Sequence, residues 1–315
     1  MIRATVILFV IALTATLVWL LKSYNFGSLT HLSGSLVATL VALSLLYSLL
    51  YGVGVALILR SLALVRSTWR VFLVISSGGT ASYLGNIQLG IPLRLFLFNK
   101  LLAVPYAIGA VSIALESACW FGLMGVALLV VGTASNFEPW VAVAVFALCV
   151  FVGYRFALPA ASQLLERLPA KWHGVPLVGM KSLLSDLVQA LCMVRWGWLA
   201  AAMAVFCVNY AIDAATIWLV ARNYGESISF WYALESIILS YLAGLVSMVP
   251  MGLGVRDISM VALLTRGGLS TDVATTVTLV QRVLRTVLPL AIGILAINVL
   301  GVRALLRQAS ETPNP

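Results

Sequence analysis

Long runs of apolar residues, separated by short polar stretches, make up most of the chain. Several of these runs approach the roughly 20 residues that a helix needs to cross a bilayer. The predicted spans cover about 4–21, 34–59, 106–132, 139–158, 197–221 and 273–299. The pattern therefore predicts an all-α polytopic membrane protein with about six full spans.

Two further apolar regions are interrupted. Residues 71–104 contain "SSGGTAS" and "GNIQLGIPLR", and residues 230–268 contain "VPMGLGVRD". Each region predicts two short helices with a break between them, because proline removes a helical hydrogen bond and glycine permits sharp turns. The residues expected at the breaks are Gly90, Pro92, Pro250, Gly252 and Gly254.

The two interrupted regions resemble each other. The aligned positions are Gly90, Pro92 and Arg94 in the first region, and Gly252, Gly254 and Arg256 in the second. A long apolar helix follows each region and carries a charge about ten residues in, at Glu116 or Arg282. The chain thus reads as one transmembrane domain, residues 1–315, with repeat-like halves at about 71–132 and 230–299.

Lysine and arginine in short loops indicate which side of the membrane each loop faces. Basic residues gather at 60–70, at 155–195 and in the C-terminal tail, whereas "TASNFEP" has none and "RNYGESIS" balances its arginine with a glutamate. The membrane sides assigned to these loops are consistent with one another only if each interrupted region enters and leaves the membrane on the same face, as a re-entrant hairpin. The prediction is an inverted-topology repeat around a central cavity, with both termini in the cytoplasm.

Composition supports a membrane location. The chain is 62% hydrophobic and only 9% charged, too few charges to cover a soluble globule, which carries about a quarter. Its net charge of +9 is spread over short loops without a contiguous basic face, so we expect no nucleic-acid partner. Anionic lipid at the cytoplasmic face is the expected partner of these loops. The sequence does not indicate an oligomeric state.

Neither a metal nor a cofactor is expected. The histidines fall in loops, and the cysteines are irregularly spaced in or beside apolar segments, without a C-x-x-C pair, which favours free thiols. These residues are His31, His173, Cys119, Cys149, Cys192 and Cys207. Within the cytoplasmic stretch 159–196, "SLLSDLVQALCMV" predicts an amphipathic helix that lies at the interface or packs on the bundle as a linker.

Four arginines lie in or beside apolar segments: Arg94, Arg256, Arg282 and Arg285. Each costs about 3 kcal/mol at the centre of a lipid-exposed helix, so they must face protein, water or an anionic ligand. The acids at similar depth are Glu116, Asp213 and Asp257. One interpretation is a buried ion-pair network, for example Arg256 with Asp257, or Arg282 and Arg285 with Asp213.

The other interpretation is an anion-binding site. Arg94 and Arg256 each follow a predicted helix break, where the next helix begins with unpaired backbone N–H groups. A guanidinium beside such a helix start suits bidentate binding of phosphate, and glycine lets the ligand approach closely.

These motifs resemble a known family, the transmembrane region of lysylphosphatidylglycerol synthetase/flippase proteins, which includes stand-alone flippase-like membrane proteins. The segment "VPMGLGVRD" is similar to the family pattern P-x-G-x-G-x-R-E, with Asp257 in place of the usual glutamate. The segment "GLSTDVATTVTLVQRVLRTVLPLAIGIL" is also similar to a family pattern, and the resemblance covers nearly the whole chain. In the first half, "GIPLR" lacks the usual acid, and "ESACW" keeps Glu116 but lacks the usual arginine and aspartate.

The resemblance implies a flippase that moves a phosphate-bearing lipid across the cytoplasmic membrane. The lipid would be an aminoacyl-phospholipid or a polyprenyl-phosphate-linked sugar. No enzymatic activity is expected, because the synthetase domain of the family is a separate soluble module. A non-transporting scaffold for envelope lipid synthesis and, less favoured, a lipid-phosphate transferase are the alternative functions.

The resemblance and the charge pattern together suggest roles for the candidate residues. Arg94 and Arg256 would hold the phosphate, and Arg282 and Arg285 would assist. The acids Glu116, Asp213 and Asp257 complete the expected substrate site. Glu116 and Asp213 would carry protons if a gradient drives transport.

Overall fold

The structure is a computed structural model that describes residues 32–64, 67–85, 87–132, 171–172, 175–176, 185, 188–247, 252 and 254–301. The predicted spans at 4–21 and 139–158 and the predicted break at Pro250 lie outside the described residues. Most of the predicted amphipathic stretch, 159–196, lies outside them as well.

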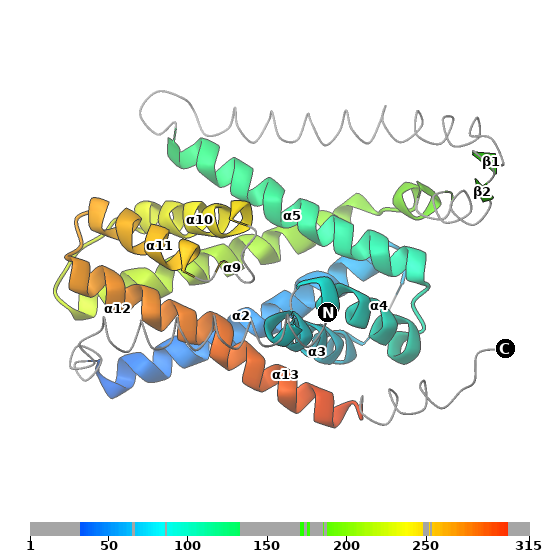
Figure 1. The fold of residues 1–315 in the computed structure, drawn as a ribbon, viewed down its shortest axis with the longest axis horizontal. Helices are drawn as coiled ribbons and strands as arrows, with labels where there is room; N and C mark the ends of the chain where they lie inside the picture. The colour runs from blue at the N-terminus through cyan, green and yellow to red at the C-terminus, as the bar shows by residue number, and fades with distance from the viewer. Residues whose placement is uncertain are drawn as a thin grey trace. The chain divides into compact units, whose positions relative to one another are not determined.

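Helices form nearly all of the described chain (Figure 1). In chain order they are α2 (Gly34–Ser61), α3 (Thr68–Gly85), α4 (Ile87–Leu102), α5 (Tyr106–Gly132), α9 (Trp196–Asn223), α10 (Phe230–Val246), α11 (Val255–Arg266), α12 (Thr271–Arg282), η4 (Val283–Val287) and α13 (Leu288–Val299). Two short strands, β1 (Lys171–Trp172) and β2 (Val175–Pro176), pair antiparallel with Lys171 opposite Pro176.

Within the described residues, four helical stretches are long and apolar enough to cross a membrane. They are Gly34–Ser61, Tyr106–Val126, Trp196–Asn223 and Thr271–Val299. These stretches confirm four of the predicted spans as helices of suitable length and composition. The 28-residue helices rise about 42 Å at 1.5 Å per residue, which exceeds the hydrocarbon thickness of a bilayer.

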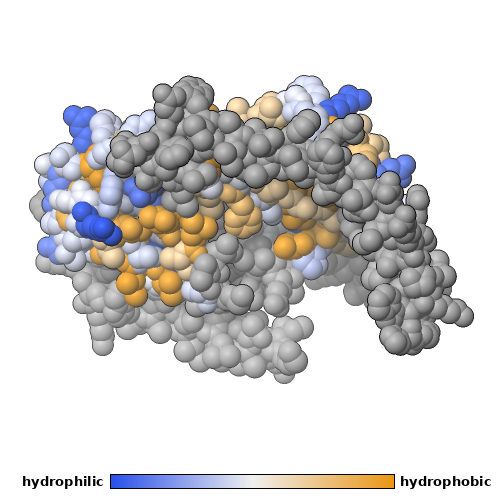
Figure 2. All heavy atoms as spheres, turned by 90° about the horizontal axis from the view of Figure 1, so that it is seen from above, coloured by the Kyte–Doolittle hydropathy of each residue, from blue (hydrophilic) through white to orange (hydrophobic). Residues whose placement is uncertain are grey.

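Apolar side chains are exposed along these helices, as lipid contact requires. On α2 they recur at Val37, Val41, Leu45 and Leu49, a spacing of four residues that places them on one face. Figure 2 shows hydrophobic side chains over much of the described surface on the face that it presents. A helical membrane protein follows from these features.

Each interrupted region forms two helices, as the sequence predicts: α3 and α4 in the first, and α10 and α11 in the second. The first break lies at a different place from the prediction, because α3 ends at Gly85 and α4 begins at Ile87. Gly90 and Pro92 therefore lie inside α4. Pro92 is the sixth residue of α4 and lacks the N–H for one hydrogen bond within the helix, yet the helix continues through it. Re-entrance and inversion of the repeat stay predictions.

The last predicted span forms one continuous helical rod (Figure 1). The helices α12 and α13 are joined by η4, a single π-helical stretch. The backbone carbonyl of Leu284 in this stretch accepts a hydrogen bond from Ser44 Oγ of α2 at 2.7 Å. Single π-turns are rare and often mark functional sites, and this one contains Arg285.

The chain divides into two compact units. The first contains the described parts of residues 1–52, 72–94 and 208–315. In this unit α13 approaches α3 so closely that a Cβ at Gly293 would overlap Thr80 Oγ1. Phe72 and Leu73 of α3 pack against Ala296 of α13 beside this contact. Small residues thus allow two membrane helices to come together.

The second unit contains the described parts of residues 53–71 and 95–207. Here the ends of α2 and α9 meet, since Arg195 donates its backbone N–H to the carbonyl of Ser61 at 2.8 Å. The guanidinium of Arg60 also stacks over the ring of Trp198 at 5.6 Å. Basic and aromatic residues together are typical of the membrane–water interface.

Candidate functional site

The hairpin of α10 and α11 holds Arg256 close to its backbone. A Cβ at Gly244 of α10 would lie 3.1 Å from Arg256 Cβ and 3.3 Å from Gly252 Cα. Gly252 itself has φ of 62°, a conformation that favours glycine, and a Cβ there would lie 2.8 Å from Gly244 Cα. Two glycines in contact therefore bring the start of α11 against α10.

The start of α11 has no side-chain cap from its N-cap residue. Its N-cap is Gly254, with φ of 79°, which offers no side-chain cap to the first turn. Asp257 in the first turn accepts the backbone N–H of Gly254 at 3.3 Å. The other N–H groups of a first turn have no intrahelical acceptor, and the helix dipole makes this end positive.

Asp257 also forms a two-pronged ion pair with α12. Arg282 Nε donates to Asp257 Oδ1 at 3.0 Å, and Arg282 Nη2 donates to Oδ2 at 2.5 Å. The two side chains are 11% and 12% exposed, so the pair is largely removed from solvent. A fork-to-fork pair of this kind fixes both groups and neutralises both charges.

A second ion pair lies deeper in the same unit. Arg285 Nε donates to Asp213 Oδ1, and the two side chains are only 3% and 1% exposed. Gln281 Nε2 donates to the same oxygen at 3.2 Å, while Gln281 Oε1 accepts from the Thr216 hydroxyl at 3.2 Å. The pairing of Arg285 with Asp213 is one that the ion-pair interpretation of the sequence anticipates.

Arg256 has different surroundings from the paired arginines. Its guanidinium carbon lies 4.0 Å from the centre of the Tyr241 ring, a cation–π contact. Within the described residues no carboxylate forms an ion pair with Arg256. The suggested pairing of Arg256 with Asp257 is therefore not the one observed, because Arg282 holds that carboxylate.

The cluster carries an excess of positive charge. Counting the described residues of these contacts, Arg256, Arg282 and Arg285 face Asp213 and Asp257, which leaves one positive charge. The buried ring of Tyr241 lies within electrostatic reach of both arginine pairs as well as of Arg256. An anion with one negative charge would make the cluster neutral.

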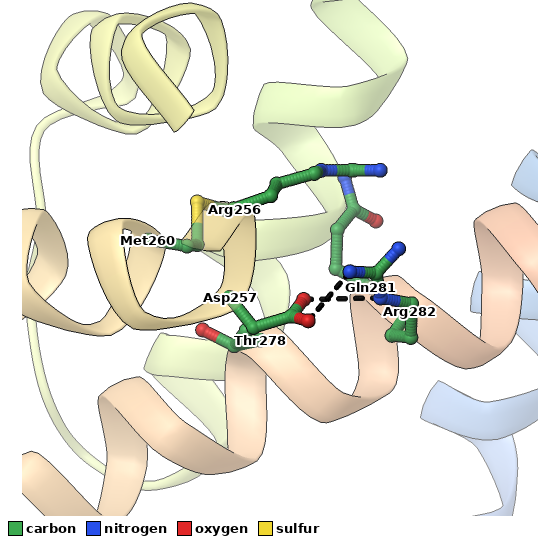
Figure 3. A pocket seen from close by; sticks show the side chains of 6 residues that line it. All are labelled: Arg256, Asp257, Met260, Thr278, Gln281 and Arg282. Atoms are coloured by element: carbon green, nitrogen blue, oxygen red, sulfur yellow. Dashed lines mark hydrogen bonds and ion pairs between the residues drawn. The ribbon is translucent and has the colours of Figure 1, made fainter. Parts of the chain in front are cut away.

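A small cavity lies beside Arg256 (Figure 3). It has a volume of about 10 Å³, enough for roughly one water molecule. Its lining residues are Arg256, Asp257, Met260, Thr278, Gln281 and Arg282. In Figure 3 the Asp257 carboxylate points to Arg282, whereas the Arg256 guanidinium extends away from that carboxylate. The cavity thus lies between Arg256, which has no ion-pair partner among the described residues, and polar groups of α11 and α12.

The remaining predicted residues, Arg94 and Glu116, are also buried. Arg94 of α4 is 9% exposed and packs against α3, where a Cβ at Gly78 would lie 3.0 Å from Arg94 Cβ. In both hairpins a glycine of the first helix therefore contacts the aligned arginine of the second. Glu116 is buried on α5 in the second unit. The structure brings together the candidates of the second half of the chain.

Sequence reasoning missed several members of the cluster. Tyr241 stacks on Arg256, and the Tyr47 ring lies 3.7 Å from the guanidinium carbon of Arg285. Ser44 Oγ lies 3.4 Å from Arg285 Nη1. Tyrosine and serine are common in membrane helices, so only the contacts with arginine reveal their place. Gln281, next to Arg282 in an apolar span, was a signal that the sequence did offer.

Comparison with known proteins places the chain in a family. A model of the family described as "Lysylphosphatidylglycerol synthase TM region" matches residues 5–293. The chain belongs to this family. The family match includes both interrupted regions and all of the candidate site residues, and it confirms the resemblance that the sequence motifs indicate.

A curated relative of this TM-region protein is the "Inner membrane protein YbhN" of Escherichia coli (strain K12). The two are 29% identical over 107 residues, which is 34% of this chain and 33% of the relative. The match therefore spans about a third of the relative's length. No solved structure matches the chain.

Metal ligands do not gather in the described part of the chain. No group of three or more histidine, cysteine, aspartate or glutamate side chains there could hold a metal ion. The chemistry that the described cluster offers is binding of an anion by guanidinium, helix start and polar side chains.

Proposed function

We propose that this membrane protein is a lipid flippase that moves a phosphate-bearing lipid across the cytoplasmic membrane. Arg256 carries the proposal, because it is the arginine of the described cluster whose charge no carboxylate neutralises. It lies in the first turn of α11, where backbone N–H groups and the helix dipole also favour an anion.

The ion pairs have a supporting role in this proposal. Arg282 holds Asp257 and Arg285 holds Asp213, so both carboxylates are occupied and do not repel the phosphate. Tyr241 fixes the guanidinium of Arg256 from one face. Its edges stay able to donate two parallel hydrogen bonds to phosphate oxygens.

The proposed mechanism needs the site to open. A cavity of about 10 Å³ is too small for a phosphate group, so the described conformation is a closed one. Transport requires the α10–α11 hairpin to move relative to α12, and the family's repeated hairpins offer a symmetric way to open either side. We expect binding and release without covalent chemistry, and therefore no enzymatic turnover of the lipid.

Lipid retention tests the proposal. The gently extracted wild type, analysed by native mass spectrometry, should carry a phosphate-bearing lipid. Arg256→Gln should reduce its occupancy at least about tenfold, since a hydrogen bond to a charged group contributes about 1.5–3 kcal/mol.

Arg222→Gln is the matched control. Arg222 also stacks on an aromatic ring, that of Trp218 at 4.6 Å, but it is exposed at the end of α9. Its loss should leave lipid occupancy unchanged. Equal lipid occupancy in wild type and Arg256→Gln would contradict the site, and would favour a scaffold without transport.

A further inference from the structure

The helical rod that α12 and α13 form changes its hydrogen bonding at η4. In this turn the backbone N–H of Leu288 donates to the carbonyl of Val283, five residues earlier, instead of to Leu284, four residues earlier. The residue after Leu288 is Pro289, which has no N–H to donate. The carbonyl of Leu284 therefore has no backbone donor within the rod.

Ser44 of α2 supplies the missing donor. Its side chain is 0% exposed, and its Oγ donates to Leu284 O at 2.7 Å. The same Oγ lies 3.4 Å from Arg285 Nη1, so one hydroxyl contacts both the backbone and a charged side chain of η4. A buried carbonyl without a partner is costly. Ser44 thus compensates for the hydrogen bond that Pro289 cannot make.

On the C-terminal side of η4, α13 is held against α3. Gly293 lies so close to this helix that an added Cβ would overlap both Thr80 Oγ1 and Ser76 O. Further along α13, Ala296 packs against Phe72 of α3. This close packing makes α13 the fixed part of the rod.

On the N-terminal side of η4, the two ends of α12 are held in different ways. At its start, the backbone N–H of Ser270 donates to Glu226 Oε2 at 2.9 Å, and the Ser270 hydroxyl donates to Oε1. At its other end, next to η4, Arg282 binds Asp257 of α11. The cavity beside Arg256 lies at this second end. The site therefore opens only if the end of α12 next to η4 moves away from α11.

A fixed α13 and a moving end of α12 require a joint between them, and η4 lies at that point. Helices bend most sharply at prolines and at π-turns, because fewer regular backbone hydrogen bonds oppose the bend there. Arg282 directly precedes the turn. A bend in η4 therefore changes the position of the arginine that closes the cavity.

We propose that η4 is the hinge at which the site beside Arg256 opens, and that Ser44 and Pro289 are positioning residues of this hinge. Bending at η4 withdraws Arg282 from Asp257 and widens the cavity, and the hydrogen bond from Ser44 holds the closed form. The inference rests on the proposed function, but opening of the site can be measured without a lipid.

The rate at which a cavity residue becomes accessible reports the hinge. Met260 lines the cavity and is 3% exposed. In the otherwise cysteine-free full chain in detergent, Met260→Cys should react with a maleimide only when the site opens. Ser44→Ala removes the bond that holds the closed form and should raise this labelling rate at least about fivefold. Ser48→Ala is the control, since Ser48 Oγ donates to a carbonyl of its own helix at 3.0 Å, and should leave the rate unchanged.

Pro289→Ala should act in the opposite direction. Alanine restores a backbone N–H that can donate to Leu284 O, five residues earlier, so the turn gains a hydrogen bond and stiffens. Labelling of Met260→Cys should slow at least about fivefold, and so should lipid movement in proteoliposomes. Added to Pro289→Ala, Ser44→Ala should change the labelling rate less than about twofold, because Leu284 O then has a second donor.

Cys119 on α5 controls for loosening of the whole fold. It is 5% exposed, and as the only cysteine of the chain it should label at the same rate with and without Ser44→Ala or Pro289→Ala. Labelling of Met260→Cys that neither substitution changes would overturn the hinge, as would equal changes at Cys119. If Arg256→Gln keeps wild-type lipid occupancy, the phosphate site fails, while the labelling rates still decide whether η4 is a hinge.

Discussion

Three arginines in the second half of the chain lie in the same cluster but differ in their partners. Arg282 and Arg285 each hold an aspartate, while Arg256 stacks on Tyr241. A paired arginine contributes structure, because its charge is already balanced. An arginine on an aromatic ring keeps its charge available, and this difference is why we propose that the phosphate binds Arg256 rather than its neighbours.

Removing one partner of the deeper pair, Arg285 and Asp213, should strongly destabilise the fold. Asp213→Asn leaves the 3% exposed side chain of Arg285 without its carboxylate, and removing one member of a buried pair costs about 3–5 kcal/mol. We expect a marked fall in the thermal unfolding midpoint in detergent. Asp257→Asn should lower it less, because that pair is 11% and 12% exposed.

A double variant provides the control for this comparison. Asp213→Asn combined with Arg285→Gln removes both charges, so no uncompensated charge stays buried. Its unfolding midpoint should lie above that of Asp213→Asn alone. A double variant less stable than the single one would contradict the view that the unpaired arginine causes the loss.

At the scale of elements, the α10–α11 hairpin depends on glycine for two different reasons. Gly252 has positive φ and also contacts Gly244, where an added Cβ would lie 2.8 Å from the backbone. Gly254 has positive φ as well, but an added Cβ would meet nothing within 4 Å. Backbone conformation restricts both positions, and packing restricts only the first.

Alanine substitutions should separate the effect of backbone conformation from the effect of packing against Gly244. Gly254→Ala has only the cost of its backbone conformation, with φ of 79° and ψ of −57°, a sparsely populated region that costs about 1–3 kcal/mol. Gly252→Ala must also push α10 and the start of α11 apart, so its unfolding midpoint should be lower and its lipid occupancy reduced. Thermal unfolding and native mass spectrometry of both variants measure this difference. Equal effects of the two substitutions would show that contact with Gly244 does not matter.

The sequence predicts the helices of this protein better than their details. Apolar length located the described spans within a few residues, and glycine and proline indicated that each interrupted region forms two helices. The first break was misplaced because α4 continues through Gly90 and Pro92 although the proline cannot donate a helical hydrogen bond. The π-turn at Val283–Val287 leaves no mark on the apolar pattern. Asp257 forms its ion pair with Arg282 because of the way α11 packs on α12, and local sequence does not determine that packing.

For the whole molecule, the distribution of basic residues predicts how the chain crosses the membrane. The loop at 62–67 should be cytoplasmic, and the loop at 224–229 should be external. In a cysteine-free background, a membrane-impermeant maleimide added to intact cells should label Ser229→Cys and leave Ser67→Cys unlabelled. Labelling of Ser67→Cys from outside, or protection of Ser229→Cys, would contradict the predicted inverted repeat.

Transport by the reconstituted protein tests the central proposal most directly. The measurement follows phosphatidylglycerol, labelled on an acyl chain with a fluorophore, across proteoliposomes that contain the wild type, Arg256→Gln or Arg222→Gln. An impermeant quencher added outside reports the lipid that has reached the outer leaflet. The account predicts movement with the wild type and Arg222→Gln, and only the rate of protein-free vesicles with Arg256→Gln. Wild-type rates in Arg256→Gln, or no movement with any of the three proteins, would contradict it.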